Sequence, residues 1–114
     1  MWVEVDGVEE LTRFMGRMPR ELRAALGEAL RRAGERAYSV SRARVPVRTG
    51  RLRASIGLTK AGELKYRVRA SAPYSRFVEF GTRRMKARPY MRPAREEALK
   101  FLGREVERRL RRLV

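Results

Sequence analysis

The chain of 114 residues contains no cysteine and no histidine. The absence of cysteine excludes disulfide bonds and thiolate metal sites. The absence of histidine removes the commonest metal ligand and the side chain that serves most often as a general base. No Gly-rich phosphate loop and no metal-ligand spacing takes their place. We therefore predict a protein that is not an enzyme and that uses no cofactor, metal or small-molecule substrate.

Asparagine and glutamine are also absent, and Asp6 is the single aspartate. Avoidance of heat-labile residues is typical of proteins from hot environments, so this bias favours a thermophilic host. A GC-rich genome would also raise the content of arginine, which supplies 25 of the 29 basic residues. Both explanations stay open on the sequence alone.

Long apolar runs, linkers, repeats and low-complexity segments are missing as well. Without a run of roughly 18 or more apolar residues, we expect no membrane-spanning helix. The first residues are acidic and lack the basic start and apolar core of a signal peptide. A chain of this length fits one domain, residues 1–114, that buries roughly two thirds of its unfolded surface.

The charge balance is strongly basic, with a net charge of +16. The sum is −3 over residues 1–16, +8 over 17–53, +3 over 54–82 and +8 over 83–114, so no single tail holds the charge. Such an excess predicts an anionic partner: nucleic acid, an acidic protein surface or a phosphate-rich surface.

The apolar spacing of the first half predicts one short strand and two helices. Residues 2–5 have the β-prone composition of an edge strand. Asp6 and Glu9 could form a capping box for a short helix that reaches Met18. A longer helix is expected over residues 19–44, because apolar residues recur there at steps of three and four.

In the second half the period changes to two, which predicts a hairpin of strands 52–58 and 64–70 joined by loop 59–63. Residues 74–81 have helical spacing although their β-prone side chains would also suit a strand, and we predict the helix. A last helix is expected over residues 93–113. The predicted fold is α+β, an antiparallel β-sheet packed against a long helix of the N-terminal half and a C-terminal helix.

One face of the predicted hairpin carries four cations and no acid: Arg53, Lys65, Arg67 and Arg69. Like charges that face each other on a sheet cost stability. Solvent could screen them, or an acidic protein or nucleic acid could neutralise them. We leave these two interpretations open.

Glu79 lies between apolar Val78 and Phe80, so we expect it to be partly buried and to need a partner. Four arginines follow closely and are candidate partners: Arg83, Arg84, Arg88 and Arg92. We predict a local ion pair that fixes the turn at Gly81 and Thr82, in preference to a contact between subunits. No second acid, base or nucleophile lies near Glu79 in sequence, so we expect no catalytic role.

The segment after this turn is a basic loop that also carries methionine and tyrosine, which are frequent in interfaces. It is either a solvated surface loop or a mobile arm that becomes ordered against a neighbouring subunit. A single tyrosine is little basis for stacking on single-stranded nucleic acid. The candidate interface residues are Glu79, Gly81, Thr82, Arg83, Arg84, Met85, Arg88, Tyr90, Met91 and Arg92.

Two blocks of sequence carry a distinctive pattern. Residues 74–94 read YSRFVEFGTRRMKARPYMRPA, and residues 45–56 read VPVRTGRLRASI. Their content, order and spacing resemble the tail-completion, or head–tail joining, family of long-tailed bacteriophages and their prophages. With a leading helix, the resemblance covers nearly the whole chain. Arg48 departs from the pattern, since that family usually carries an acidic or neutral residue there.

The resemblance implies a structural virion protein of a tailed phage or prophage, found in the neck or tail and, during assembly, in the host cytoplasm. It implies a homo-oligomeric ring of six copies around the DNA path, in contact with connector and tail-tube proteins. The alternative is a sequence-nonspecific nucleic-acid-binding protein with the sheet-face cations and the loop over residues 83–92 on phosphates. Phosphate binding would weaken steeply with salt, whereas assembly would give a defined oligomer.

Overall fold

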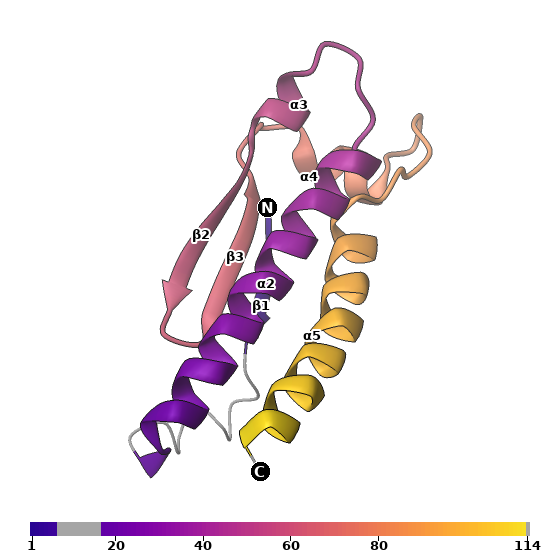
Figure 1. Cartoon of the computed structure of the whole chain (residues 1–114). Coiled ribbons are helices and arrows are strands. Elements are labelled where there is room, and N and C mark those ends of the chain that lie inside the picture. The colour runs from indigo at the N-terminus through magenta and orange to yellow at the C-terminus, as the bar shows by residue number, and fades with distance from the viewer. Residues whose placement is uncertain (7–16, 114) are drawn as a thin grey trace.

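The computed structural model of the chain describes residues 1–6 and 17–113 (Figure 1). The elements of this part are β1 (Trp2–Asp6), α2 (Arg20–Arg44), α3 (Arg51–Ala54), β2 (Ile56–Gly62), β3 (Lys65–Ala70), α4 (Ser75–Phe80) and α5 (Met91–Leu113). Asp6, the first residue of the predicted capping box, is the last residue of β1, whereas Glu9 and nearly all of the helix predicted after it lie outside the described residues.

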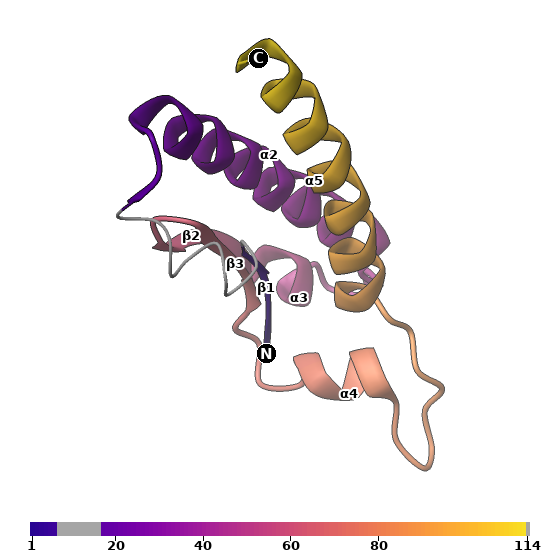
Figure 2. The same cartoon turned by 90° about the horizontal axis from the view of Figure 1, so that it is seen from below.

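The molecule has two layers, a three-stranded antiparallel sheet and a pair of long helices (Figures 1 and 2). The strands lie in the order β1-β3-β2, so β1 is an edge strand, as predicted. Helices α2 and α5 pack against each other over one face of the sheet. The predicted α+β class, with the sheet against a long helix and a C-terminal helix, is confirmed. The shape is elongated, 53 × 22 × 22 Å, and α3, α4 and their loops share one end.

Helix α2 spans 25 residues and follows Pro19, as predicted from the apolar stripe. The buried stripe consists mostly of small residues: Leu26, Ala29, Leu30, Ala33, Gly34, Ala37 and Ser41. Helix α5 meets it with the fully buried Ala94 and Ala98. Small side chains let the helix backbones approach each other and the sheet closely, so burial here depends on close packing rather than on large side chains.

The structure corrects the predicted hairpin at both ends of its first strand. Residues 52–54 form part of α3, because Gly50 takes a φ of +80° and turns the chain into a single helical turn. Leu52 is buried in this helical turn, just as it would be in a strand. The alternation of apolar and polar residues therefore predicted a strand that begins too early. The predicted loop 59–63 is also wrong, since β2 continues to Gly62 through a register shift and a tight turn leads into β3.

The two elements after the sheet follow the sequence pattern more closely. The segment after Tyr74 is helical, as α4, so the strand alternative is excluded. Helix α5 begins at Met91, two residues before the predicted start at Pro93. Pro93 lies in the first turn, where its missing N–H would have no partner within the helix. In the part of the chain that the structure describes, no helix is long and apolar enough to cross a membrane.

The two glycines within α2 give a test of its packing on the sheet. A Cβ atom on Gly34 would lie 2.9 Å from Tyr66 Cβ and 3.3 Å from Leu58 Cδ1, whereas a Cβ on Gly27 would meet no described neighbour within 4 Å. We expect Gly27→Ala to raise the free energy of unfolding by about 0.5–1 kcal/mol through helix propensity. Gly34→Ala should lower it by about 1–3 kcal/mol, because Tyr66 Cβ cannot rotate away. Urea denaturation followed by circular dichroism measures both; a Gly34→Ala variant as stable as Gly27→Ala would contradict this packing.

Candidate functional site

Glu79 is buried, with 4% of its surface exposed, and its carboxylate caps the start of α5. Oε1 accepts hydrogen bonds from the backbone N–H groups of Tyr90 (3.0 Å) and Met91 (2.8 Å), and Oε2 accepts one from Arg92 (3.2 Å). Because the next residue, Pro93, has no N–H, one side chain satisfies the donors at this helix start. The negative charge also lies at the positive end of the helix dipole.

The predicted arginine partner of Glu79 is therefore wrong. Among the described residues, none of Arg83, Arg84, Arg88 and Arg92 forms an ion pair with this carboxylate, and Arg92 lies 3.8 Å from Glu96 instead. The physical reason is that three converging backbone N–H groups supply both the directional donors and the partial positive charge that a buried carboxylate requires. Glu79 thus ties α4 to α5 and does not fix the turn at Gly81 by an ion pair.

Tyr90 makes a second connection between these two helices. Its side chain is fully buried, and its hydroxyl donates a hydrogen bond to the Ser75 carbonyl at 3.1 Å. Burial, with a smaller contribution from the charge of nearby Glu79, raises the pKa of Tyr90 to about 12. The hydroxyl therefore stays protonated and keeps donating throughout the physiological pH range.

The loop between α4 and α5 is a closed turn. Gly81 has a φ of +77°, and a Cβ there would lie 2.7 Å from Ala87 N, so both its backbone angle and its surroundings require glycine. Thr82 N donates to Met85 O at 2.9 Å, and Thr82 Oγ1 accepts from Met85 N at 3.1 Å. Arg88 N donates to Val78 O at 2.8 Å, which fastens the far side of the loop to α4. The basic side chains of the loop are thus held on an ordered backbone.

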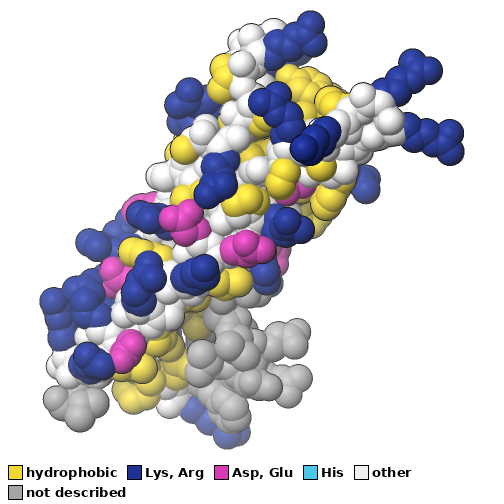
Figure 3. Space-filling model, turned by 90° about the vertical axis from the view of Figure 1, so that its right-hand side faces the viewer, with side chains coloured by type: hydrophobic (Ala, Val, Ile, Leu, Met, Phe, Trp, Pro, Cys, Tyr) yellow, Lys and Arg dark blue, Asp and Glu magenta, His cyan; other side chains and the backbone are white. Residues whose placement is uncertain are grey.

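One end of the molecule, which we name the cationic end, gathers nine basic residues from α2, α3, α4 and the adjoining loops (Figure 1). They are Arg44, Arg48, Arg51, Arg53, Arg76, Arg83, Arg84, Lys86 and Arg88. Over residues 44–55 and 71–90 the single carboxylate is Glu79, which is buried. Within the described part of the chain none of the nine forms an ion pair, and Figure 3 shows Lys and Arg side chains projecting from this end without acidic neighbours.

Elsewhere on the two long helices many charged side chains form ion pairs. On α2, Arg31 pairs with both Glu28 and Glu35, and on α5 Glu105 accepts from Arg108 at 2.6 Å and Arg109 at 3.3 Å. Hydrogen bonds from Arg31 and from Arg108 are the main causes that lower the pKa of Glu28 and of Glu105. The cationic end differs from these regions because its basic residues have almost no acids nearby.

The four cations predicted for one sheet face do not all lie on the sheet in the structure. Arg53 lies on α3, at the cationic end. Lys65, Arg67 and Arg69 lie on β3, but that surface does contain an acid, because β1 places Glu4 opposite Arg67. Arg67 Nη2 donates to Glu4 at 2.7 Å, and this hydrogen bond is the main cause that lowers the pKa of Glu4. The sheet face is partly neutralised within the chain, so it is a weaker candidate for an anionic partner.

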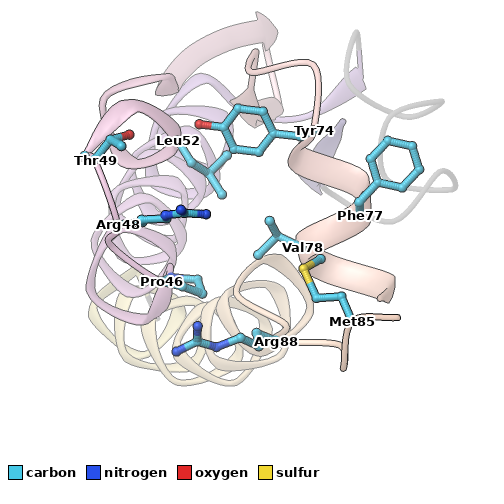
Figure 4. Close-up of a pocket in the computed structure, with 10 residues that line it drawn as sticks. Pro46, Arg48, Thr49, Leu52, Tyr74, Phe77, Val78, Met85 and Arg88 are labelled. Carbon is cyan, nitrogen blue, oxygen red and sulfur yellow. The ribbon is translucent and has the colours of Figure 1, made fainter. Parts of the chain in front are cut away.

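A pocket of about 340 Å³ opens in the cationic end (Figure 4). It is lined by Pro46, Arg48, Thr49, Gly50, Leu52, Tyr74, Phe77, Val78, Met85 and Arg88. Figure 4 shows Arg48 and Leu52 on one wall facing Val78 and Met85 on the other. The two distinctive sequence blocks, 45–56 and 74–94, thus meet across one pocket. The sequence did not predict the pocket, because each block taken alone indicates only a turn with apolar residues beside it.

The predicted interface residues fall into two groups in the structure. Glu79, Tyr90 and Met91 are buried within the chain, and Gly81 is half-buried. Exposed are Thr82, Arg83, Arg84, Met85, Arg88 and Arg92. The buried group holds the loop in place, and the exposed group is available to a partner, together with Phe77 and Phe80, which are 55% and 69% exposed.

Comparison with known protein families gives a match that covers most of the residues that line the pocket. The model of the HK97-gp10-like family, described as a tail component of bacteriophage, matches residues 9–81. This span is nearly two thirds of the chain and includes α2, β2, β3 and α4. No curated protein and no solved structure gives a match.

The cap at α5 can be tested by Glu79→Gln. We expect the free energy of unfolding to fall by about 2 kcal/mol or more, because the amide has one acceptor oxygen and would point its own donor at a backbone N–H. Glu96→Gln is the matched control, since Glu96 is exposed and its contact with Arg92 should contribute about 0–1 kcal/mol. Thermal and urea denaturation measure the difference. Equal stability of the two variants would show that the cap does not hold α5.

Proposed function

The chain belongs to the HK97-gp10-like family of bacteriophage tail components, and from this we propose that it is a tail-completion protein that joins the phage head and tail. It acts by protein–protein contacts, with no catalytic turnover. Copies of the chain form a ring, six in number, around the path of the DNA. The observation that carries the proposal is the family match over residues 9–81, the span that contains most of the pocket-lining residues.

The surface of the cationic end supports a role in assembly. Apolar side chains are exposed there beside arginines, with Phe77 55%, Phe80 69% and Met85 40% exposed. Aromatic residues, methionine and arginine are enriched in protein interfaces, and exposed apolar patches mark interaction sites. The contacts proposed for this end are with connector and tail-tube proteins, in the virion neck and, before that, in the host cytoplasm.

Nonspecific nucleic-acid binding is the second candidate function. The nine basic residues of the cationic end favour it, because unpaired cations bind phosphates without regard to sequence. The exposed apolar side chains count against it, since phosphate contacts do not require them. The pairing of Glu4 with Lys65 and Arg67 further reduces the cationic surface on the sheet. Assembly therefore remains the better-supported function, with DNA near the protein in the ring.

A thermophilic source is a separate part of the proposal. The chain lacks asparagine, glutamine and cysteine, and α2 and α5 carry networks in which one side chain pairs with two others. Such networks contribute more at high temperature than isolated pairs do at 25 °C. We expect an unfolding midpoint above the mesophilic range of about 45–65 °C, measured by calorimetry. A midpoint below about 60 °C would count against a thermophilic host.

Light scattering, with duplex-DNA binding measured in parallel, separates assembly from nucleic-acid binding. We expect a defined oligomer, either of the chain alone or after mixing with connector and tail-tube proteins, and weak DNA binding. The double variant Arg83→Glu/Arg84→Glu should lose assembly with connector and tail-tube proteins, whereas Lys100→Glu/Arg104→Glu, with the same charge change on α5, should keep it. A protein that stays monomeric with every neck protein, while binding duplex DNA with a steep salt dependence, would support the second function instead.

A further inference from the structure

We propose that the pocket of the cationic end binds an acidic segment of a different virion protein, with one apolar side chain inside the pocket and carboxylates on Arg48 and Arg88. This inference rests on the proposed assembly function and specifies the chemistry of the partner. The pocket is the place where the two sides of the cationic end meet, so a segment bound there would contact α3, α4 and both adjoining loops.

The shape and lining of the pocket suit an apolar side chain. Its volume, about 340 Å³, lies at the lower end of the range of about 300–1,000 Å³ for ligand sites, which fits a short segment rather than a large ligand. Leu52, Tyr74, Val78 and Met85 supply apolar parts of the wall (Figure 4). Burying an apolar side chain against them removes apolar surface of both partners from water.

The charges around the pocket favour a partner segment in which acidic residues lie next to the apolar residue. Arg48 and Arg88 line the pocket from opposite segments, and both are exposed. No described carboxylate pairs with either of them. Guanidinium groups bind carboxylates through two parallel hydrogen bonds, so each could hold one acidic side chain of the segment. The apolar residue of the partner is therefore flanked by aspartate or glutamate.

A second copy of this chain is a poorer occupant, because most of its described carboxylates already have partners and only Asp6 and Glu21 among them have none. Eight of them form ion pairs: Glu4, Glu28, Glu35, Glu63, Glu96, Glu97, Glu105 and Glu107. A ninth, Glu79, caps α5. Two copies, each with a net charge of +16, would also repel one another at this end. The ring contacts between copies consequently use other surfaces, and the pocket is left for a partner of opposite charge.

Nucleic acid is also less suitable than an acidic protein segment. Its phosphates would satisfy the arginines but would leave the apolar walls in contact with water. A base in the pocket could stack on Tyr74, yet strong single-strand binding normally uses several aromatic platforms. The lining contains only two aromatic residues, Tyr74 and Phe77, and Phe77 is 55% exposed.

Two fluorescein-labelled peptides test the pocket directly. One has phenylalanine between two pairs of glutamates, and the other has alanine in its place, so the two peptides have the same charge. We expect fluorescence anisotropy to show binding of the phenylalanine peptide at least about tenfold tighter than that of the alanine peptide, as burial of an aromatic side chain implies. Methyl NMR of the unmodified protein should show shifts at Leu52 and Val78 with the first peptide, which locates the site without any variant.

Matched variants distinguish the pocket from general attraction to a basic protein. Arg48→Glu and Arg104→Glu change the net charge equally. We expect only Arg48→Glu to weaken binding of the phenylalanine peptide, by about tenfold or more. Met85→Ser and Leu99→Ser replace side chains of similar exposure, 40% and 37%. Only Met85→Ser should reduce the difference in affinity between the phenylalanine peptide and the alanine peptide. Circular dichroism confirms that each variant is folded.

Four results would overturn the inference: equal affinity for the two peptides, equal effects of Arg48→Glu and Arg104→Glu, NMR shifts confined to another surface, or displacement of the peptide by a single-stranded oligonucleotide of similar charge. Self-association that the phenylalanine peptide abolishes would overturn it too, since the occupant would then be a second copy. The binding assay needs no assembled particle. If the chain assembles with neck proteins but does not bind the phenylalanine peptide, only the inference about the pocket is contradicted. If it binds the peptide but never assembles, only the proposed assembly function is contradicted.

Discussion

Three consecutive backbone N–H groups at the start of α5 converge on the carboxylate of Glu79. A buried carboxylate without partners would be costly, and a helix start without acceptors would be costly as well, so each feature makes the other tolerable. Through this contact and the hydroxyl of Tyr90, α4 is fixed against α5, which in turn packs on α2. The loop between α4 and α5 and the pocket beside it have a defined geometry because these contacts lie beneath them.

The charge distribution follows from the same arrangement. Acids lie along α2, α5 and β1, where they meet arginines from neighbouring turns and strands, and the one acid of the α4 region is directed inward. Positive charge without acidic neighbours consequently lies at one end of an elongated molecule. Local repulsion among these cations costs stability, a cost that an anionic partner would remove.

Periodicity and proline positions were sufficient to predict α2, the edge strand, α4 and most of α5. They failed at α3, because a single helical turn after Gly50 buries Leu52 just as a strand would. The partner of Glu79 could not be read from side-chain types, since its donors are backbone groups that every residue carries. The pairing of Glu4 with Arg67 depends on strand register across 63 positions, and the pocket depends on two segments that become neighbours only in the fold.

Gly81 and Thr82 close the loop after α4 through backbone and hydroxyl contacts, and the side chains at positions 83, 84 and 86 take no part in that closure. Folding and partner choice therefore depend on different positions of one short segment. Related phages could exchange these solvent-facing residues, and so follow changes in an adjoining virion protein, without disturbing the interior that holds the loop. The segment therefore combines a backbone fixed by internal contacts with exposed side chains that can be replaced.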